Sequence, residues 1–229
     1  MHSVIFDLDG TLADTSVDLI AAANACFIGM GVGPQLDPMA DASTAFKGGR
    51  AMLTLGMQRL GRADDLDEIE RQYPLLLAHY GENIDANTVF YEGALDAVHR
   101  LRARGVTVGI CTNKPEGLAE TLMSRMGARD LFDALIGADT LPVRKPDPAP
   151  LAETIRLVGG VPERSVLIGD TITDRKCAEN LGIPCVLVTF GPDGDGVRDL
   201  APEGLLDHYS RLEAVLAEVM EGFAAEAGA

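Results

Sequence analysis

The segment VIFDLDGTLAD, near the start of the chain, places three carboxylates, Asp7, Asp9 and Asp14, directly after an apolar run. Aspartate is a poor strand residue, and unpaired carboxylates beside an apolar segment repel each other and resist removal from water. Taken alone, the segment has two interpretations. It is either a solvated turn, in which Asp and Gly are common, or a site that holds a positive charge.

Further polar residues stand at or near the ends of other segments that resemble strands: Thr112, Asn113, Lys145, Asp170 and Asp174. In doubly wound sheets, ligands bind beyond the carboxyl ends of the strands. We therefore expect these side chains to meet the first aspartates in one crevice.

This combination of residues suits phosphate chemistry with a divalent cation. Clustered carboxylates favour Mg²⁺, which takes oxygen ligands and would offset both their repulsion and the charge of a phosphate. Thr112, Asn113 and Lys145 would hold phosphate oxygens, helped by N–H groups of the helix that follows Asn113. Asp7 would attack phosphorus and form an aspartyl-phosphate. Asp9 would give a proton to the departing oxygen and later take one from water.

The elements expected to position these groups alternate along the chain. Strands rich in apolar residues are predicted at 2–6, 106–112, 165–169 and 184–190, with a weaker one at 134–137. Helices are predicted at 92–105, 114–127, 145–160 and 173–182. Nearly continuous apolar strands separated by amphipathic helices indicate an α/β fold with a doubly wound parallel sheet.

One interval, residues 15–88, interrupts this alternation, because it shows amphipathic helical patterns and no convincing strand. A crossover between parallel strands needs only about 10–12 residues, so this interval is too long for a loop. We predict a helical cap domain there, inserted after the first strand. The catalytic core is then made of residues 1–14 and 89–229. The Gly/Asp-rich stretch at 191–199 is expected to be a surface loop.

The segment FKGGRAM in the predicted cap contains two cations beside a flexible bend. Gly49 belongs to the Gly-Gly pair, and Lys47 and Arg50 flank it. The two side chains could pair with a carboxylate of the substrate. A solvated helix start with two exposed cations explains the segment about as well.

Composition limits the possible partners. The formal net charge of −16 disfavours nucleic acid and anionic membrane surfaces. The four cysteines are scattered without a CxxC pair, which is typical of reduced thiols in a cytoplasmic protein and not of a zinc site. We expect no leader peptide and no membrane span, because no apolar run approaches about 20 residues.

Four motifs in this order, DLDGT, TNK, RKPDP and GDTITD, resemble those of haloacid dehalogenase (HAD)-like hydrolases. The likeness is greatest to phosphoglycolate phosphatases that carry a helical cap. The resemblance implies that Asp7 is the nucleophile and Asp9 the general acid and base, with Thr112 and Lys145 on the phosphate. It also implies that the cap segment with Lys47, Gly49 and Arg50 carries substrate specificity.

The same resemblance implies how Mg²⁺ would be bound. Asp7, the backbone carbonyl of Asp9, and Asp170 would be its ligands, and Asp174 would support them through water or hydrogen bonds. Arg175 and Lys176, which follow the last motif, have no functional explanation at this level.

Two residues separate this chain from neighbouring families. Asp9 argues against dehalogenases and phosphonate hydrolases, which resemble this chain but lack an Asp there. Leu19 stands where β-phosphoglucomutases have a histidine. The expected activity is Mg²⁺-dependent hydrolysis of a small anionic phosphorylated metabolite, with 2-phosphoglycolate as the first choice. A sugar-phosphate phosphatase, a β-phosphoglucomutase-like phosphotransferase and a catalytically silent phosphate-binding module are alternatives. The chain is expected to be a monomer or a homodimer.

Overall fold

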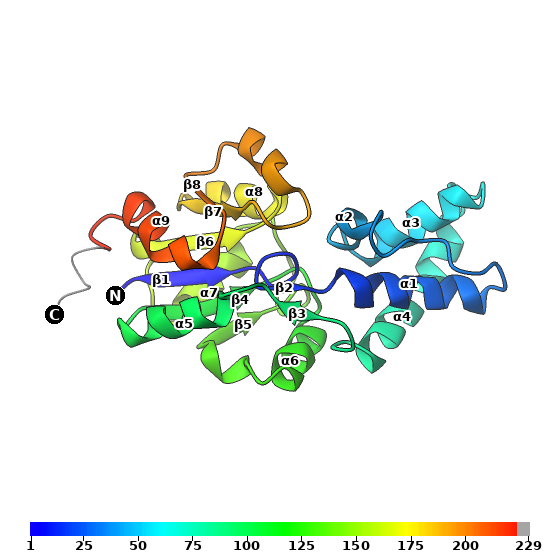
Figure 1. Ribbon diagram of the computed structural model, residues 1–229, viewed down its shortest axis with the longest axis horizontal. Coiled ribbons are helices and arrows are strands. Elements are labelled where there is room, and N and C mark those ends of the chain that lie inside the picture. Colours follow the sequence, from blue (N-terminus) through cyan, green and yellow to red (C-terminus); the bar gives the residue numbers. More distant parts are fainter. Residues whose placement is uncertain (224–229) are drawn as a thin grey trace. The chain divides into compact units, whose positions relative to one another are not determined.

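The computed structural model describes residues 1–223 and divides into two compact units (Figure 1). The first unit contains Met1–Ala13 and the chain from Phe90 onward, and the second contains Asp14–Val89. Residues 224–229, which are predicted to belong to the core, lie outside the described residues.

A six-stranded parallel sheet forms the centre of the first unit, with strand order β5-β4-β1-β6-β7-β8. The strands are β1 (Ser3–Phe6), β4 (Thr107–Cys111), β5 (Ala134–Ile136), β6 (Ser165–Gly169), β7 (Cys185–Val188) and β8 (Gly204–Leu206). In the register of the sheet, Ser3 lies opposite Thr107 on one side and Ser165 on the other. The predicted α/β fold with a doubly wound parallel sheet is confirmed.

Helices cover both faces of this sheet. They are α5 (Ala94–Ala103), α6 (Glu116–Arg125), α7 (Ala149–Leu157), α8 (Ile172–Leu181) and α9 (Leu212–Val219). Ile5 and Leu167 belong to the same apolar cluster as Leu151 of α7 and Cys177 of α8. Successive strand residues point to opposite faces, so the alternate residues of β1 and β6 lie on the other face. That second face packs against α5 and α9.

Two features near the β8 edge of the sheet differ from the predictions made from the sequence. The stretch expected to be a surface loop folds as a 3-10 helix over Gly194–Leu200, because Val197 is buried against the sheet. Strand β8 was not predicted, since it begins with Gly204, a poor strand residue, and only Leu206 of its three residues is fully buried. Arg175 forms an ion pair with Glu203 at 3.2 Å, and Glu203 accepts the N–H of Cys185. Arg175 therefore connects α8 to the segment before β8.

The second unit is helical. It contains α1 (Ser16–Gly29), α2 (Ala42–Ala45), α3 (Gly49–Arg59) and α4 (Leu66–Glu82). A side chain at Gly56 of α3 would meet the ring of Phe27 of α1, so this glycine permits the close approach of the two helices. The short strands β2 (Ala13–Asp14) and β3 (Val89–Phe90) pair where the chain passes between the units.

A buried carboxylate connects the beginning and the end of the second unit. Asp18 of α1 accepts hydrogen bonds from the backbone N–H groups of Asn87 and Thr88 and from both their side chains. Because several donors share this carboxylate, its burial is well compensated. Asp18 thereby fixes the end of the unit to its first helix.

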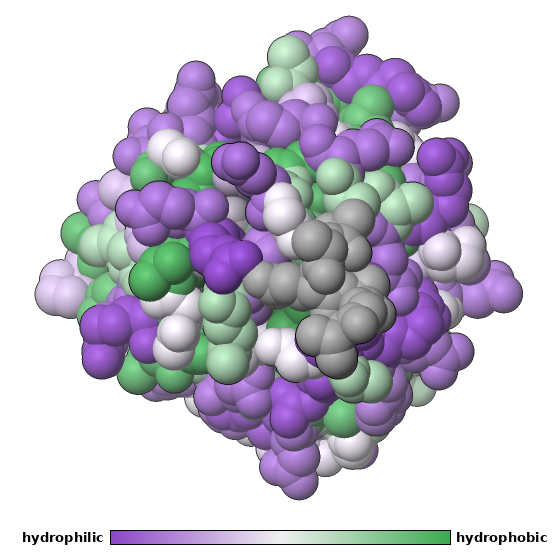
Figure 2. Space-filling model, turned by 90° about the vertical axis from the view of Figure 1, so that its left-hand side faces the viewer, coloured by the Kyte–Doolittle hydropathy of each residue, from purple (hydrophilic) through white to green (hydrophobic). Residues whose placement is uncertain are grey.

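Hydrophilic side chains dominate the face of the molecule in Figure 2, where apolar residues form small separate groups. Within residues 1–223, none of the helices has both the length and the apolar character needed to cross a bilayer.

Candidate active site

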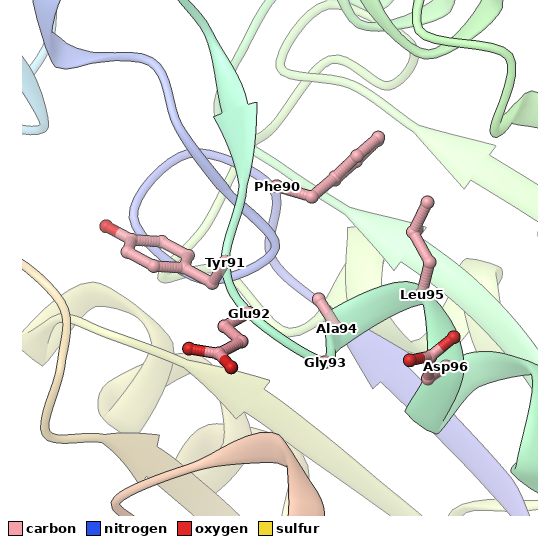
Figure 3. Close-up of a pocket in the computed structure, with 7 residues that line it drawn as sticks. All are labelled: Phe90, Tyr91, Glu92, Gly93, Ala94, Leu95 and Asp96. Atoms are coloured by element: carbon pink, nitrogen blue, oxygen red, sulfur yellow. The ribbon is translucent and has the colours of Figure 1, made fainter.

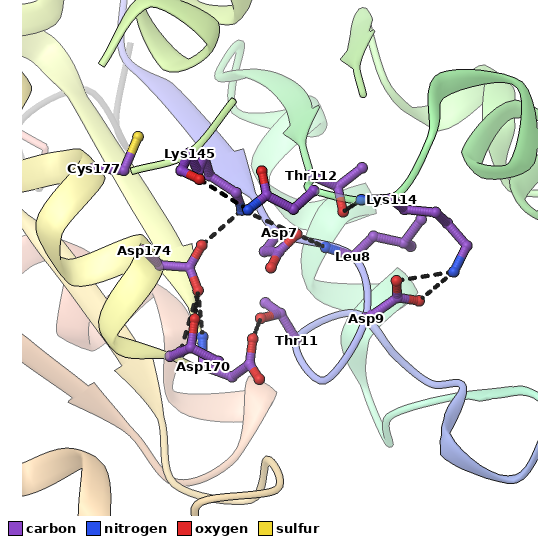
Figure 4. Close-up of polar contacts among 12 residues, drawn as sticks. Asp7, Leu8, Asp9, Thr11, Thr112, Lys114, Lys145, Asp170, Asp174 and Cys177 are labelled. Atoms are coloured by element: carbon purple, nitrogen blue, oxygen red, sulfur yellow. Dashed lines mark hydrogen bonds and ion pairs between the residues drawn. The ribbon is translucent and has the colours of Figure 1, made fainter. Parts of the chain in front are cut away.

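The carboxyl ends of β1, β4 and β6 bring the predicted site residues together (Figure 4). Asp7 directly follows β1, Thr112 follows β4 and Asp170 follows β6. These three strands are neighbours in the sheet, so their ends lie side by side. Asp7, Asp170 and Asp174 each offer a carboxylate oxygen, and these oxygens lie within 4.8 Å of one another.

A buried lysine lies against this cluster. The Nζ atom of Lys145 is 2.7 Å from Oδ1 of Asp174 and 3.1 Å from Oδ1 of Asp7, and only 1% of its side chain is exposed. Burial by itself would lower the pKa of Lys145, but Asp174 and Asp7 raise it well above the ordinary value. Lys145 is therefore a permanent cation beside Asp7.

Asp174 has hydrogen bonds to both of its oxygens. Its Oδ1 accepts from Lys145, and its Oδ2 accepts from the backbone N–H and the hydroxyl of Thr171 at the start of α8. This capping box fixes the first turn of the helix. A Cβ at Gly169 would collide with Asp174, so the glycine is required for this close approach. Asp174 consequently holds Lys145 and the first turn of α8 in place.

Only one of the two carboxylate oxygens of Asp170 has a hydrogen-bond partner among the described residues. Its Oδ1 accepts the hydroxyl proton of Thr11 at 3.0 Å, whereas its Oδ2 is buried and has no hydrogen-bond partner among the described residues. Burial first, and then the charges of Asp174 and Asp7, raise the pKa of Asp170 well above its ordinary value. An unpaired buried carboxylate oxygen is costly unless a ligand meets it.

The pKa of Asp7 is raised as well. Its Oδ1 accepts the N–H of Leu8 at 2.7 Å and faces Lys145. Burial raises the pKa of Asp7 to about 6, with Lys145 opposing this effect and Asp174 adding to it. The carboxylate is therefore ionised at neutral pH at an energetic cost.

The donor set fits a divalent metal ion. Four carboxylates, Asp7, Asp9, Asp170 and Asp174, share the region with the ammonium groups of Lys114 and Lys145. If all are ionised, two negative charges remain unbalanced. The unpaired Oδ2 of Asp170 and the carboxylate of Asp7 are the oxygens best suited to a hard cation such as Mg²⁺.

Asp9 lies apart from this cluster. Both of its oxygens contact Nζ of Lys114, at 2.8 and 2.9 Å, and Figure 4 shows its side chain directed toward that lysine and away from Asp7. Thr11 and Lys114 stand at strand ends in the sequence, Lys114 within the TNK motif, but the sequence assigns neither of them a role. Their contacts with Asp170 and Asp9 join positions far apart in the chain, so no sequence spacing indicates them.

Thr112 and Asn113 differ in their surroundings. The buried Thr112 accepts the N–H of Lys114 at its hydroxyl oxygen, which leaves the hydroxyl proton available to a ligand. The exposed Asn113 donates its amide N–H to the carbonyl oxygen of Lys145 and so joins two loops. The N–H of Glu116, at the start of α6, donates to Oδ1 of Asp139 and is therefore not one of the N–H groups available to phosphate.

The predicted specificity residues lie in the second unit. Lys47 is exposed, and Gly49 is the first residue of α3, close to the ring of Tyr73. Arg50 makes two hydrogen bonds to Glu70, at 2.6 and 2.9 Å, and its guanidinium lies 3.8 Å from the centre of the Tyr73 ring.

A separate concavity is lined by residues 90–96, where β3 leads into α5 (Figure 3). Figure 3 shows Phe90 and Tyr91 pointing to different sides of the chain. Tyr91 packs against Phe190, which packs against Tyr209, and the hydroxyl of Tyr209 donates to the carbonyl oxygen of Thr11. This concavity contains none of the predicted site residues, and its aromatic neighbours support the loop that carries Asp7.

The raised pKa of Asp7 predicts a pH dependence of stability in the absence of metal. Between about pH 4 and pH 6 the folded state still binds a proton that the unfolded chain has released, so Asp7 lowers the stability as pH rises. Urea unfolding in EDTA should therefore show Asp7→Asn becoming more stable relative to wild type across this range, by up to about 3 kcal/mol. A relative stability that is constant, or that falls with rising pH, would contradict this assignment.

A doubly wound α/β fold with clustered carboxylates and a buried lysine at its central strand ends supplies groups that phosphoryl transfer and hydrolysis require. The family comparison is specific: the model of haloacid dehalogenase-like hydrolases matches residues 4–188, and the chain belongs to this family.

Curated relatives agree with this assignment, and a solved structure shares the fold. The chain is 37% identical over 215 residues to a phosphoglycolate phosphatase of Mesorhizobium japonicum, with 94% of each chain covered. It is 37% identical over 217 residues to one of Rhodospirillum rubrum, covering 92% of this chain and 88% of that protein. A crystal structure of a predicted phosphoglycolate phosphatase from Haemophilus somnus shares the fold, with a TM-score of 0.82, 23% identity, and coverage of 93% and 96%.

Proposed function

We propose that this protein is a Mg²⁺-dependent phosphatase that hydrolyses a small phosphate monoester through an aspartyl-phosphate on Asp7. The observation that carries this proposal is the Asp7 carboxylate beside Lys145 and the unpaired buried oxygen of Asp170. The family and the relatives named phosphoglycolate phosphatase support a phosphatase. They also make 2-phosphoglycolate the first substrate to test.

Different residues have different roles in the first step, the transfer of the phosphoryl group to Asp7. Lys145 and Thr112 hold phosphate oxygens, and the fixed charge of Lys145 stabilises the negative charge that spreads over the phosphoryl group. Asp7 forms a bond to phosphorus as the bond to the departing oxygen breaks. Mg²⁺, held by Asp7 and Asp170 with the backbone carbonyl of Asp9, would neutralise charge on the carboxylates and the phosphate.

Asp9 carries the proton in both steps. It gives a proton to the departing oxygen, and then it takes one from the water that attacks the phosphorus of the aspartyl-phosphate. Asp174 contributes indirectly, because it holds Lys145 and the turn that begins α8.

Substrate choice is proposed to depend on the segment with Lys47, Gly49 and Arg50. Arg50 already pairs with Glu70, whereas no ion pair of Lys47 is found among residues 1–223. Lys47 is therefore the better candidate for pairing with a carboxylate of the substrate.

Phosphate release from a panel of esters at equal concentration tests this function. We expect 2-phosphoglycolate to give the highest kcat/KM, EDTA to lower it at least about 100-fold, and Mg²⁺ to restore it. A preference for sugar phosphates would overturn the choice of substrate. Transfer to a second hydroxyl, seen as an isomeric sugar phosphate, would show a mutase. Activity that is insensitive to EDTA would overturn the metal dependence.

A further inference from the structure

Lys114 forms a nearly buried ion pair that the proposed mechanism does not use. Its Nζ lies 2.8 Å from Oδ1 of Asp9, and only 3% of the Lys114 side chain and 19% of the Asp9 side chain are exposed. Removing an ammonium group from water costs several kcal/mol unless a partner compensates it. The pair therefore fixes the positions of both side chains.

The direction of this pair matters for phosphoryl transfer. In an in-line displacement the attacking and departing oxygens lie on opposite sides of phosphorus. A group that protonates the departing oxygen must therefore reach the side of phosphorus opposite the nucleophile. In Figure 4 the carboxylate of Asp9 is turned away from Asp7 and toward Lys114.

Lys114 is itself held in place by the end of β4. Its backbone N–H donates to Oγ1 of Thr112 at 3.2 Å, so the residue that contacts Asp9 follows directly on a predicted phosphate-binding residue. The pair joins the loop after β1 to the loop after β4, two neighbouring strands. The pair thereby links the position of Asp9, the proposed proton carrier, to the position of Thr112, which is proposed to bind phosphate.

We propose that Lys114 is a positioning residue that holds Asp9 toward the departing oxygen of the substrate. This inference rests on the proposed function, in which Asp9 carries the proton. The ammonium can hold Asp9 in either protonation state, because a protonated carboxyl still accepts a hydrogen bond at its carbonyl oxygen while its O–H donates. The proton then passes from Asp9 to the departing oxygen as the bond from that oxygen to phosphorus breaks.

The test compares two aryl phosphates that differ in their need for a proton. Phenyl phosphate has a poor leaving group, whereas p-nitrophenyl phosphate has a good one that departs with little help. Lys114→Met should lower kcat/KM about 100-fold for phenyl phosphate and at most about 10-fold for p-nitrophenyl phosphate. Lys114→Arg, which keeps a cation able to bind both oxygens, should recover most of the loss.

Asp9→Asn serves as the reference, and it should show the same dependence on the leaving group more strongly. In the double variant, Lys114→Met should add less than about threefold to the loss caused by Asp9→Asn, because both act through one group. Lys176→Met removes an exposed lysine of α8 and should change kcat/KM less than about twofold. Thermal unfolding of each variant reports folding, and Lys114→Gln provides a second variant that keeps a donor.

An equal loss for both esters, or an additive loss in the double variant, would overturn the role of Lys114. Lys114 would then act on the phosphate itself or only on folding. Wild-type activity of Asp9→Asn on phenyl phosphate would instead overturn the proposed function of Asp9, a result that differs from failure of the Lys114 inference alone.

Discussion

Replacing Asp7 with asparagine is expected to abolish Mg²⁺-dependent turnover of p-nitrophenyl phosphate, lowering kcat by at least about 10⁴-fold. The amide cannot form the aspartyl-phosphate, although it retains the shape of the side chain. The loss should appear with every phosphate ester, since the same nucleophile serves all of them. Initial rates with saturating Mg²⁺ measure it directly.

The fold should survive this replacement. Burial raises the pKa of Asp7 to about 6, so an uncharged side chain relieves an unfavourable ionisation at neutral pH. The metal-free variant should unfold at the same temperature as wild type or higher. Asp14→Asn is a matched control from the same segment, because its side-chain oxygen can still accept from Ser16. It should keep turnover within about twofold, and wild-type turnover by Asp7→Asn would show that Asp7 is not the nucleophile.

Replacing Lys145 with methionine is expected to damage both activity and folding. Lys145 is buried between Asp7 and Asp174, and removing it leaves these carboxylates without their cation. Breaking a buried pair from one side costs about 3–5 kcal/mol of unfolding free energy. Loss of the fixed charge that we propose acts on the phosphate should lower kcat/KM at least about 10³-fold.

The pH dependence separates this electrostatic effect from a packing defect. Without Lys145, the pKa of Asp7 should rise further, so the folded variant takes up protons as the pH falls. The stability deficit of Lys145→Met against wild type should therefore be smaller at about pH 5 than at about pH 8. Mg²⁺ should also reduce the deficit by occupying the cluster. A deficit that is independent of both pH and Mg²⁺ would indicate lost packing instead, and Lys176→Met controls for removal of one lysine.

Much of the fold could be predicted from the sequence because the central strands are short apolar runs with polar residues directly after them. Asp7, Thr112 and Asp170 follow β1, β4 and β6, and the topology of a parallel sheet brings such positions together. The edge strand β8 was missed because it begins with a glycine and is only partly buried, whereas the equally short β5 is an apolar run that is buried throughout.

The contacts among the site residues could not be predicted, because they join positions far apart in the chain. Thr11 donates to Asp170 and Lys114 pairs with Asp9, and neither pair has a spacing that a sequence pattern reveals. The contact of Arg50 in the second unit could not be predicted either. Its two hydrogen bonds to Glu70 compete with a substrate for the guanidinium, and the sequence does not indicate Glu70 as its partner.

Chemical trapping of the phosphorylated enzyme tests whether phosphate passes through Asp7. The protein is mixed with p-nitrophenyl phosphate and Mg²⁺, quenched during turnover and treated with borohydride, which reduces an acyl phosphate to an alcohol. Mass spectrometry of the peptide that contains Asp7 should then find homoserine at that position, and the product should be absent when EDTA replaces Mg²⁺. Homoserine at another aspartate, or unmodified Asp7 while turnover proceeds in a burst, would contradict an aspartyl-phosphate on Asp7.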